Sequence, residues 1–539
     1  MNAPDGTPAP LVESDAVTSA TSADPLINAE PSAPSATEDV IELILVSHRG
    51  PVRFDPDCHR GGGGLVTALR DLVRNATSTT WICAASTPTE IELASTAQSV
   101  AIAIDDSVVH QATSTGSSDS LERNDPTIAN CHVRFVATAP SAHHKFYAVI
   151  ANPMLWFIQH GLWDHTRSPM IGSHELDAWN HGYLTVNEAF ADAIATELVD
   201  ASPSAVIMVH DYHFYTLPAS LRARAVQQLI HFFIHIPWPA ADAWRTLRPT
   251  IRDAIVTGLL HCDLVAFHTD RYARNFLSTC ADLLRLDVDW HARTVQFEGR
   301  QVAVRFYPIS VDAQSLLHLA DTKEVATHQA ALEATRREFL ILRVDRADPS
   351  KNILRGFHAY ARLLELHPVL NERVTFLALL QPTREDVREY REYRQEIEQL
   401  VAEINQRFAT LAWQPIDLRF VEDLGLAVAA YREFDVLMVN ALADGMNLVA
   451  KEALIVNERD GVLALSELAG AHEELGAAAV TLYPFDIEQQ AEALWDSLTM
   501  APGERKARHV AGLDIVSTNN VAKWLRHQLD DLSDIARTR

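Results

Sequence analysis

One stretch in the last third of the chain restricts the possible folds more than any other. It begins with an apolar run over residues 434–440, which has the pattern of a buried strand, and ends with a helical pattern over residues 450–456. The turn between them contains Asp444 and Gly445. A strand, a glycine-containing turn and a helix form one unit of a parallel α/β sheet, and the free N–H groups of the helix N-terminus suit a phosphate or a sugar hydroxyl. These residues alone fit an ordinary strand-to-helix turn equally well.

The alternation of strands and helices continues on both sides of this stretch. In the second half of the chain we expect strands over residues 338–344, 374–379, 418–421, 434–439, 461–465 and 479–482. The first half has the same pattern, with strands over residues 40–46, 205–209, 229–234 and 264–267. Such alternation is typical of a doubly wound parallel sheet, and a chain of 539 residues is too long for one core. The prediction is an α/β protein with two Rossmann-like domains that face each other across a cleft.

The domain boundaries follow from the same pattern. We expect the first domain over residues 40–325, the second over 326–505, and a C-terminal helix within 506–539 that crosses back to the first domain. Residues 1–39 are rich in Ala, Pro, Ser and Thr and lack the basic and apolar regions of a signal peptide. They are therefore predicted to be a disordered extension.

The composition argues against several classes of function. No apolar run approaches the length of a membrane span, and a net charge of −26 disfavours a nucleic-acid-binding surface. The five cysteines are scattered and form no C-x-x-C pair, so neither a disulfide framework nor a zinc site is indicated. Reduced thiols fit a cytoplasmic enzyme, which is the location we predict.

Polar side chains follow two of the predicted strands in the first half. His210, Asp211, Tyr212 and His213 come directly after residues 205–209, and His235 follows the next strand. Ligands of open parallel sheets bind beyond the carboxyl ends of the strands, so these side chains are candidates for a binding site. A metal site would need further ligands at suitable spacing, and the sequence offers none.

Basic residues follow other strands and indicate phosphate binding. Arg49 comes after the first strand and precedes a run of four glycines, residues 61–64, whose backbone allows a close approach by a ligand. Arg346 and Lys351 lie on either side of a strand-to-helix turn, where cations are unfavourable unless an anion lies between them. Arg384 follows another strand. The simpler interpretation is a glycine loop and solvated charges.

An aromatic segment over residues 145–157 completes the set of candidates. Core packing is the simpler interpretation for Phe146 and Phe157. Tyr147 and Trp156 are amphipathic, and such rings also stack on sugars.

Taken in order, these motifs resemble those of one enzyme family. They are Ser-His-Arg with Gly-Gly-Leu, the segment from Tyr147 to Trp156, His-Asp-Tyr-His, His-Ile-Pro-Trp-Pro, Asp-Arg-x-x-x-Ser-Lys, Pro-Thr-Arg-x-Asp-Val and Asp-Gly-Met-Asn-Leu-Val-Ala-Lys-Glu. The chain resembles the trehalose-6-phosphate synthases, retaining glycosyltransferases of family 20 with the GT-B fold, over residues 40–529. The resemblance implies transfer of glucose from a nucleoside diphosphate glucose to glucose 6-phosphate, without a cofactor or a metal.

The resemblance also implies the roles of individual residues. The acceptor glucose 6-phosphate would be held by Arg49, Tyr147, Trp156, Asp211, Tyr212 and Arg384. The donor would be held by Gly63, Gly64, His235, Arg346, Lys351, Asp444, Asn447, Leu448 and Glu452. The residues that take part in the chemistry would be Asp211, His235, Arg346 and Lys351.

Three departures from the family pattern leave alternatives open. The turn reads Ser-Lys-Asn where many members have Ser-Lys-Gly, Ala443 precedes Asp444 where an arginine is common, and a tryptophan expected near Ala84 has no counterpart. With the four-glycine turn, these features resemble the actinobacterial branch, and they leave UDP-glucose and GDP-glucose equally plausible as donors.

The alternatives in function are a related transfer and a regulator. The related transfers are to glycerol phosphate or between cyclitols, by pseudoglycosyltransferases that also carry Lys-Asn and Trp-Pro at these positions. The regulator would be a catalytically weak sugar-phosphate-binding protein. The presence of His213 and of the complete motif from Asp444 to Glu452 favours glucosyl transfer. No phosphatase-like D-x-D-x-T segment follows residue 500, so a separate phosphatase is expected downstream, and the sequence leaves a homo-oligomer open.

Overall fold

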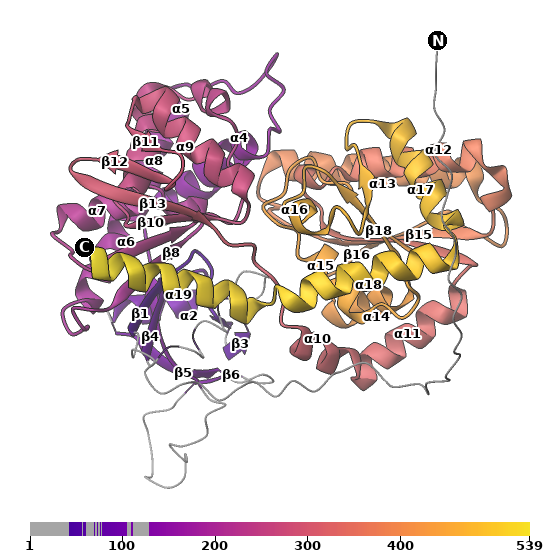
Figure 1. Cartoon of the computed structure of the whole chain (residues 1–539), viewed down its shortest axis with the longest axis horizontal. Helices are drawn as coiled ribbons and strands as arrows, with labels where there is room; N and C mark the ends of the chain where they lie inside the picture. Colours follow the sequence, from indigo (N-terminus) through magenta and orange to yellow (C-terminus); the bar gives the residue numbers. More distant parts are fainter. Residues whose placement is uncertain are drawn as a thin grey trace, which may run out of the picture. The chain divides into compact units, whose positions relative to one another are not determined.

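A computed structural model of the chain describes residues 42–55, 58–60, 69, 73, 76, 78–96, 98–104, 109–111 and 129–539 (Figure 1). The glycine run with Gly63 and Gly64 lies outside these residues, as does the extension predicted over residues 1–39. Residues 41–539 form one compact unit.

The first half of the chain builds an eleven-stranded sheet in the order β11-β12-β13-β10-β9-β8-β1-β4-β7-β5-β6. Its seven central strands are parallel: β1 (Glu42–Val46), β4 (Ser78–Ala84), β7 (Ala129–Val136), β8 (Val206–His210), β9 (Leu229–Phe233), β10 (Leu264–Phe267) and β13 (Arg300–Phe306). Antiparallel strands extend both edges: β5 (Val100–Ile104), β6 (Val109–Gln111), β11 (Val288–Asp289) and β12 (Thr294–Phe297). The strand order reverses between β1 and β8, which makes their carboxyl ends a topological switch point.

The second half builds a sheet of six parallel strands in the order β16-β15-β14-β17-β18-β19. The strands are β14 (Phe339–Arg346), β15 (Val374–Gln381), β16 (Ile416–Phe420), β17 (Val436–Val439), β18 (Val462–Ser466) and β19 (Val480–Leu482). Here the order reverses between β14 and β17. A second switch point therefore lies where the sequence has Arg346, Lys351 and Asp444.

The strands are continuous apolar runs because helices cover both faces of each sheet. Along β1, Leu43 and Leu45 belong to one hydrophobic core, and Ile44 and Val46 belong to another. On the second sheet, α12 (Ile353–Leu366) packs against α17 (Ile487–Thr499), whereas α14 (Leu424–Glu433) packs against α15 (Val449–Val456). The core that includes Leu45 also includes Leu437 of β17, so the two halves share apolar packing.

Four helices connect the two halves. After β13, α10 (Ala313–Ala320) and α11 (Lys323–Thr335) lead into β14 and pack on α14. At the C-terminus, α18 (Pro502–Thr518) packs on α15 and β18, and α19 (Val521–Thr538) continues to β9 of the first sheet (Figure 1). The Trp524 ring of α19 lies 5.5 Å from the Phe233 ring, and the Tyr307 hydroxyl donates to Asp531 Oδ2 at 2.5 Å.

The remaining helices of the first half include an unusual one at the aromatic segment. Residues Lys145–Trp156 form a π-helix, η1, which contains Pro153 and continues into α4 (Phe157–Gln159). The other helices are α2 (Pro88–Ser95), α3 (Pro140–His144), α5 (Ser173–Ala178), α6 (Leu184–Glu197), α7 (Leu217–Ala223), α8 (Pro249–Leu260) and α9 (Asp270–Leu284). Among the helices of the described residues, none is long and apolar enough to cross a membrane.

Candidate active site

The carboxyl ends of β1 and β8 carry the residues that the sequence assigned to the acceptor. Asp211 follows β8 in a left-handed conformation, with φ of 76°, and its Oδ1 accepts the backbone N–H of His235 at 3.3 Å. Burial raises the pKa of the Asp211 carboxyl to about 7, although hydrogen bonds and the nearby Arg384 and Arg346 act in the opposite direction. The Arg49 side chain, after β1, is exposed to solvent.

Tyr212 connects the aromatic segment to the second half. Its hydroxyl donates to Asn152 Oδ1 at 2.8 Å and accepts from Arg384 Nη2 at 3.1 Å. Tyr147, from the same segment, stacks on His48 at 5.2 Å, and His48 stacks on His213 at 4.5 Å between ring centroids. Burial lowers the pKa of His48 to about 3, so the stack carries no imidazolium charge at neutral pH.

Trp156 lies at the centre of this side of the site. The guanidinium carbon of Arg384 is 3.9 Å from the centroid of its ring, and that of Arg346 is 5.1 Å away. Both distances are those of a cation–π interaction. The indole N–H donates to Asp348 Oδ1 at 3.4 Å, and this bond joins the two halves of the chain.

His235 belongs to a line of three hydrogen-bonded imidazoles. His210 Nδ1 is 3.0 Å from His235 Nε2, and His235 Nδ1 is 3.2 Å from His268 Nε2. His268 Nδ1 then lies 3.4 Å from the Tyr307 carbonyl oxygen. Since a carbonyl only accepts, His268 must donate to it, His235 must donate to His268, and His210 must donate to His235. Both ring nitrogens of His235 are therefore engaged in this arrangement.

Burial keeps the three imidazoles neutral. It lowers the pKa of His268 to about 3, and those of His210 and His235 well below their usual range. The sequence analysis did not include His268. Its position directly after strand β10 is the same signal that pointed to His235.

The second switch point holds cations that are paired with carboxylates. Lys351 forms an ion pair with Asp444 Oδ2, and its Nζ lies 3.8 Å from Asp345 Oδ1. Burial alone would lower the pKa of the Lys351 ammonium, but Asp444 and Asp345 outweigh it and raise that pKa. Arg346 Nη1 is 3.5 Å from Asp348 Oδ2, and Arg384 Nη1 is 3.0 Å from the same oxygen. Three carboxylates thus pair with four cations, because Arg343 Nη1 also lies 3.4 Å from Asp345 Oδ2.

The loop after β17 approaches the first half at Gly445. A Cβ at this position would lie 1.8 Å from the carbonyl oxygen of His235, so only glycine fits. Next to it, the Asp444 carbonyl accepts the Tyr272 hydroxyl at 2.8 Å. Asn447 has a φ of 78° and donates from Nδ2 to Asp444 Oδ2 at 3.1 Å. These contacts hold the Asp444 loop directly beside His235.

Leu448 and Glu452 lie at the start of α15. Leu448 is the N-cap residue. The Ala450 N–H donates to Asn447 Oδ1 at 3.2 Å, and the N–H groups of Lys451 and Glu452 donate to the Leu448 carbonyl at 2.9 and 2.8 Å. Glu452 Oε2 accepts the Tyr431 hydroxyl at 3.2 Å, and burial raises the pKa of the Glu452 carboxyl. Its neighbour Lys451 has a structural role, because the buried ammonium pairs with Glu474 and donates to the Ile309 carbonyl at 2.8 Å.

The structure explains the departure from the family pattern after Lys351. Asn352 has a φ of 56°, in the left-handed region that glycine and asparagine tolerate best. Its side-chain amide donates to the carbonyls of Asn440 at 3.0 Å and Pro484 at 2.7 Å. The asparagine therefore provides the same backbone conformation as glycine and adds two buried hydrogen bonds.

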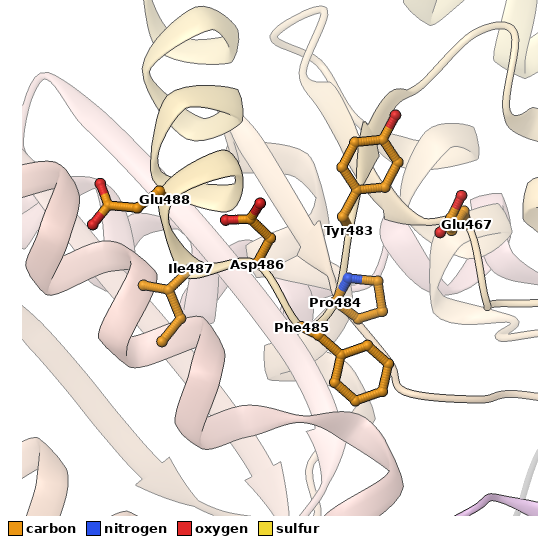
Figure 2. Close-up of a pocket in the computed structure, with 7 residues that line it drawn as sticks. All are labelled: Glu467, Tyr483, Pro484, Phe485, Asp486, Ile487 and Glu488. Atoms are coloured by element: carbon orange, nitrogen blue, oxygen red, sulfur yellow. The ribbon is translucent and has the colours of Figure 1, made fainter.

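The described residues have two further features, one of which adjoins the turn after Lys351 through the bond from Asn352 to the Pro484 carbonyl. A hollow of about 470 Å³ is lined by Glu467 and residues 483–488, and the rings of Tyr483 and Phe485 project to different sides of the chain there (Figure 2). Glu324, His328 and Asp423 lie close enough together to share a cation. Neither set contains a residue that the sequence assigned to substrate.

Comparison with known proteins places the chain in a family. The model of Glycosyltransferase family 20 matches residues 52–534. The alpha,alpha-trehalose-phosphate synthase [UDP-forming] A of Dictyostelium discoideum is 30% identical over 491 residues, which are 89% of this chain and 61% of that protein. The chain thus spans less than two thirds of that relative's length.

Two further proteins show similarity over most of their length. The validamine 7-phosphate valienyltransferase of Streptomyces hygroscopicus subsp. jinggangensis is 32% identical over 403 residues, 74% of this chain and 79% of that protein. The crystal structure of an alpha,alpha-trehalose-phosphate synthase (UDP-forming) from Burkholderia xenovorans, in complex with glucose-6-phosphate, has a TM-score of 0.74 at 29% identity. The similarity covers 91% of this chain and all of that one. The protein belongs to glycosyltransferase family 20 and has the GT-B fold, in which two Rossmann-like halves carry the site.

Proposed function

We propose that the protein transfers glucose from a nucleoside diphosphate glucose to glucose 6-phosphate and forms α,α-trehalose 6-phosphate with retention of configuration. One observation carries the proposal. At the second switch point, Lys351 pairs with Asp444, and Arg346 lies over the same Trp156 ring as Arg384. A diphosphate site thus lies next to a site suited to a sugar phosphate.

The acceptor would bind at the first switch point. Its phosphate, a dianion, would take the guanidinium groups of Arg49 and Arg384 and the polar atoms of Tyr147 and Trp156. The sugar hydroxyls would bond to Asp211 and Tyr212, whose polar atoms lie at the end of β8. Ring stacking on Trp156 would orient the pyranose.

The donor would bind at the second switch point. Its diphosphate would bind the guanidinium of Arg346 and the ammonium of Lys351 beside the carboxylates that already pair with them. Gly63 and Gly64, which lie outside the described residues, are also assigned to the donor. Asp444, Asn447 and the N-terminus of α15 at Leu448 would hold the glucose, and Glu452 would hold the ribose. Since Gly445 brings this loop against His235, the reacting carbon would lie between the halves.

The chemistry needs no enzyme nucleophile. The bond from the anomeric carbon to the diphosphate breaks, and Arg346 and Lys351 stabilise the charge that forms on the leaving phosphate. The acceptor hydroxyl attacks from the same face, and its proton passes to the departing phosphate oxygen. His235, held neutral in one tautomer, and Asp211 orient the sugars during this step. Closure of the cleft excludes water and limits hydrolysis of the donor.

A second candidate is the coupling of a cyclitol to a sugar-like phosphate. The similarity to the valienyltransferase of Streptomyces hygroscopicus, at 32% identity over 79% of its length, favours it specifically. The same pocket for a phosphorylated acceptor would serve both reactions.

A product analysis distinguishes these candidates. The purified protein is incubated with glucose 6-phosphate and either UDP-glucose or GDP-glucose, with EDTA present. A non-reducing α,α-linked disaccharide phosphate is expected, and the printed names of the relatives support UDP-glucose as the better donor. Failure with both donors, together with turnover of a nucleoside diphosphate cyclitol, would replace the proposal by the second candidate.

A further inference from the structure

Asp348 is a buried carboxylate to which the sequence analysis gave no role. Its side chain is completely buried, and its charge is retained. Burial alone would raise its pKa, but Arg346, Arg384 and the Ser350 backbone N–H outweigh burial and lower that pKa to about 2. A buried anion of this kind persists only when its partners are held in place around it.

The two oxygens of Asp348 serve different partners. Oδ1 accepts the Ser350 backbone N–H at 2.9 Å, the Ser350 hydroxyl at 2.8 Å and the Trp156 indole N–H at 3.4 Å. Oδ2 accepts Arg384 Nη1 at 3.0 Å and the Tyr390 hydroxyl at 3.4 Å, and lies 3.5 Å from Arg346 Nη1.

These partners belong to both halves of the proposed reaction. Trp156 and Arg384 are assigned to the acceptor, whereas Arg346 is assigned to the diphosphate of the donor. Ser350 lies in the 3₁₀ turn Pro349–Lys351, which ends at the donor-binding lysine, and the Lys351 backbone N–H donates to the Asp348 carbonyl at 2.9 Å. One carboxylate therefore fixes groups of the acceptor site and of the donor site together.

We propose that Asp348 is a positioning residue that couples the binding of the two substrates. The inference rests on the proposed function. Whichever substrate binds first restrains the Trp156, Arg384 and Arg346 side chains in the arrangement that they have around Asp348. The second substrate then meets a site that is already ordered, so it binds more tightly. The Trp156–Asp348 hydrogen bond carries this coupling from one half to the other.

The test is a measurement of coupling by calorimetry. The Kd of UDP is measured with and without saturating glucose 6-phosphate, for the full-length protein and for Asp348→Asn. In the wild type we expect glucose 6-phosphate to tighten UDP binding by at least about fivefold, the lower end of typical coupling between sites. The asparagine keeps an oxygen for Ser350 and Trp156 but directs an N–H₂ group at the two arginines. The coupling factor of this variant should fall to about 1.

Two further variants each remove one contact of Asp348, one at Oδ1 and the other at Oδ2. Trp156→Phe removes the indole N–H that donates to Asp348, keeps an aromatic but smaller ring under Arg384 and Arg346, and should lower the coupling factor even if Asp348→Asn fails to fold. Tyr390→Phe removes the hydroxyl that contacts both Oδ2 and Arg384 Nη1 and leaves the Trp156–Asp348 bond in place. It should retain most of the coupling and serves as the matched control, with thermal unfolding measured for all three.

The outcomes separate the inference from the proposed function. Wild-type coupling in both Asp348→Asn and Trp156→Phe would overturn the inference while the proposed function stands. If the wild-type protein neither binds nor converts glucose 6-phosphate, the proposed function itself fails. Loss of coupling in Asp348→Asn, with each substrate still binding alone and thermal unfolding unchanged, supports a role in positioning over one in folding.

Discussion

The two switch points of this protein differ in the charge of the groups that line them. At the first, His48, His210, His235 and His268 are neutral because burial lowers their pKa values, and the other groups are largely aromatic rings. At the second, Lys351, Arg346 and Arg384 are fully charged and paired with Asp345, Asp348 and Asp444. A neutral surface suits sugar hydroxyls, whereas a charged one suits a leaving diphosphate.

The two switch points also differ in how their buried polar groups find partners in the absence of substrate. His210, His235 and His268 are joined by a line of hydrogen bonds that ends at the Tyr307 carbonyl. The cations need counter-ions, and the carboxylates supply them. The cations are therefore paired and fixed without substrate, so the site avoids the cost of unpaired buried charge.

The largest expected effect comes from removing a charge at the second switch point. Lys351→Ala should lower kcat on the order of 10²–10³-fold, because the ammonium stabilises the charge of the leaving group in the transition state. The KM for glucose 6-phosphate should change little, since Lys351 is assigned to the donor alone. Steady-state kinetics with both substrates varied checks this. A large rise in the acceptor KM with kcat unchanged would mean that the two sides are assigned the wrong way round.

The next largest effect is expected at Gly445, where the Asp444 loop of the second half contacts His235 of the first half. Gly445→Ala puts a Cβ 1.8 Å from the His235 carbonyl oxygen, so the Asp444 loop must move away from the first half. A displacement of about 1 Å can cost on the order of 10²-fold in rate, and we expect a loss of kcat of that order. Gly503→Ala is the matched control, because nothing lies within 4 Å of its added Cβ. Equal activity in the two variants would show that the close approach is not needed for turnover.

Arg384 tests whether the two switch points have separate roles. It follows β15 of the second half of the chain, yet it is assigned to the acceptor, which would bind at the first switch point. Arg384→Ala should raise the KM for glucose 6-phosphate by about 10–100-fold, as loss of a hydrogen bond to a charged group costs about 1.5–3 kcal/mol. The donor KM should change less. Arg388→Ala, with an exposed side chain at the start of α13 (Arg388–Phe408), controls for the loss of a nearby arginine. Identical acceptor KM values in the two variants would remove Arg384 from the acceptor site.

Much of the fold was predictable because buried parallel strands are continuous apolar runs. The strand expected over residues 434–439 is β17 (Val436–Val439), and the one expected over 229–234 is β9 (Leu229–Phe233). The helical pattern of residues 244–260 belongs to two helices and not to one. The structure has a 3₁₀ helix, η4 (Ala241–Thr246), followed by α8, because Pro249 begins a new helix.

Two signals in the sequence led to the candidate site: polar residues at strand ends, such as Asp211, His235, Arg346 and Arg384, and the amphipathic rings of Tyr147 and Trp156. The role of Asp348 depends on a hydrogen bond to Trp156, 192 positions earlier in the chain, and no local pattern indicates such a contact. The burial of Arg343 could not be predicted either, because an arginine within an apolar strand has no local pattern that indicates its partners. The side chain is completely buried and donates to the Lys351 carbonyl at 3.0 Å. The predicted domain boundaries and substrate roles stay predictions.

The smallest effect is a dependence of stability on pH at the neutral switch point. The pKa of Asp211 is raised by burial to about 7, whereas in the unfolded chain the carboxyl ionises near 3.8. Between these pH values the folded protein holds a proton that the unfolded chain has lost, so this group's contribution to stability falls as pH rises from about 4 to about 7. Asp211→Asn cannot ionise and should lose this slope. Urea unfolding of both proteins between pH 5 and 8 measures the difference. Parallel profiles would show that Asp211 is ionised throughout this range, and the first switch point would then carry a charge of its own.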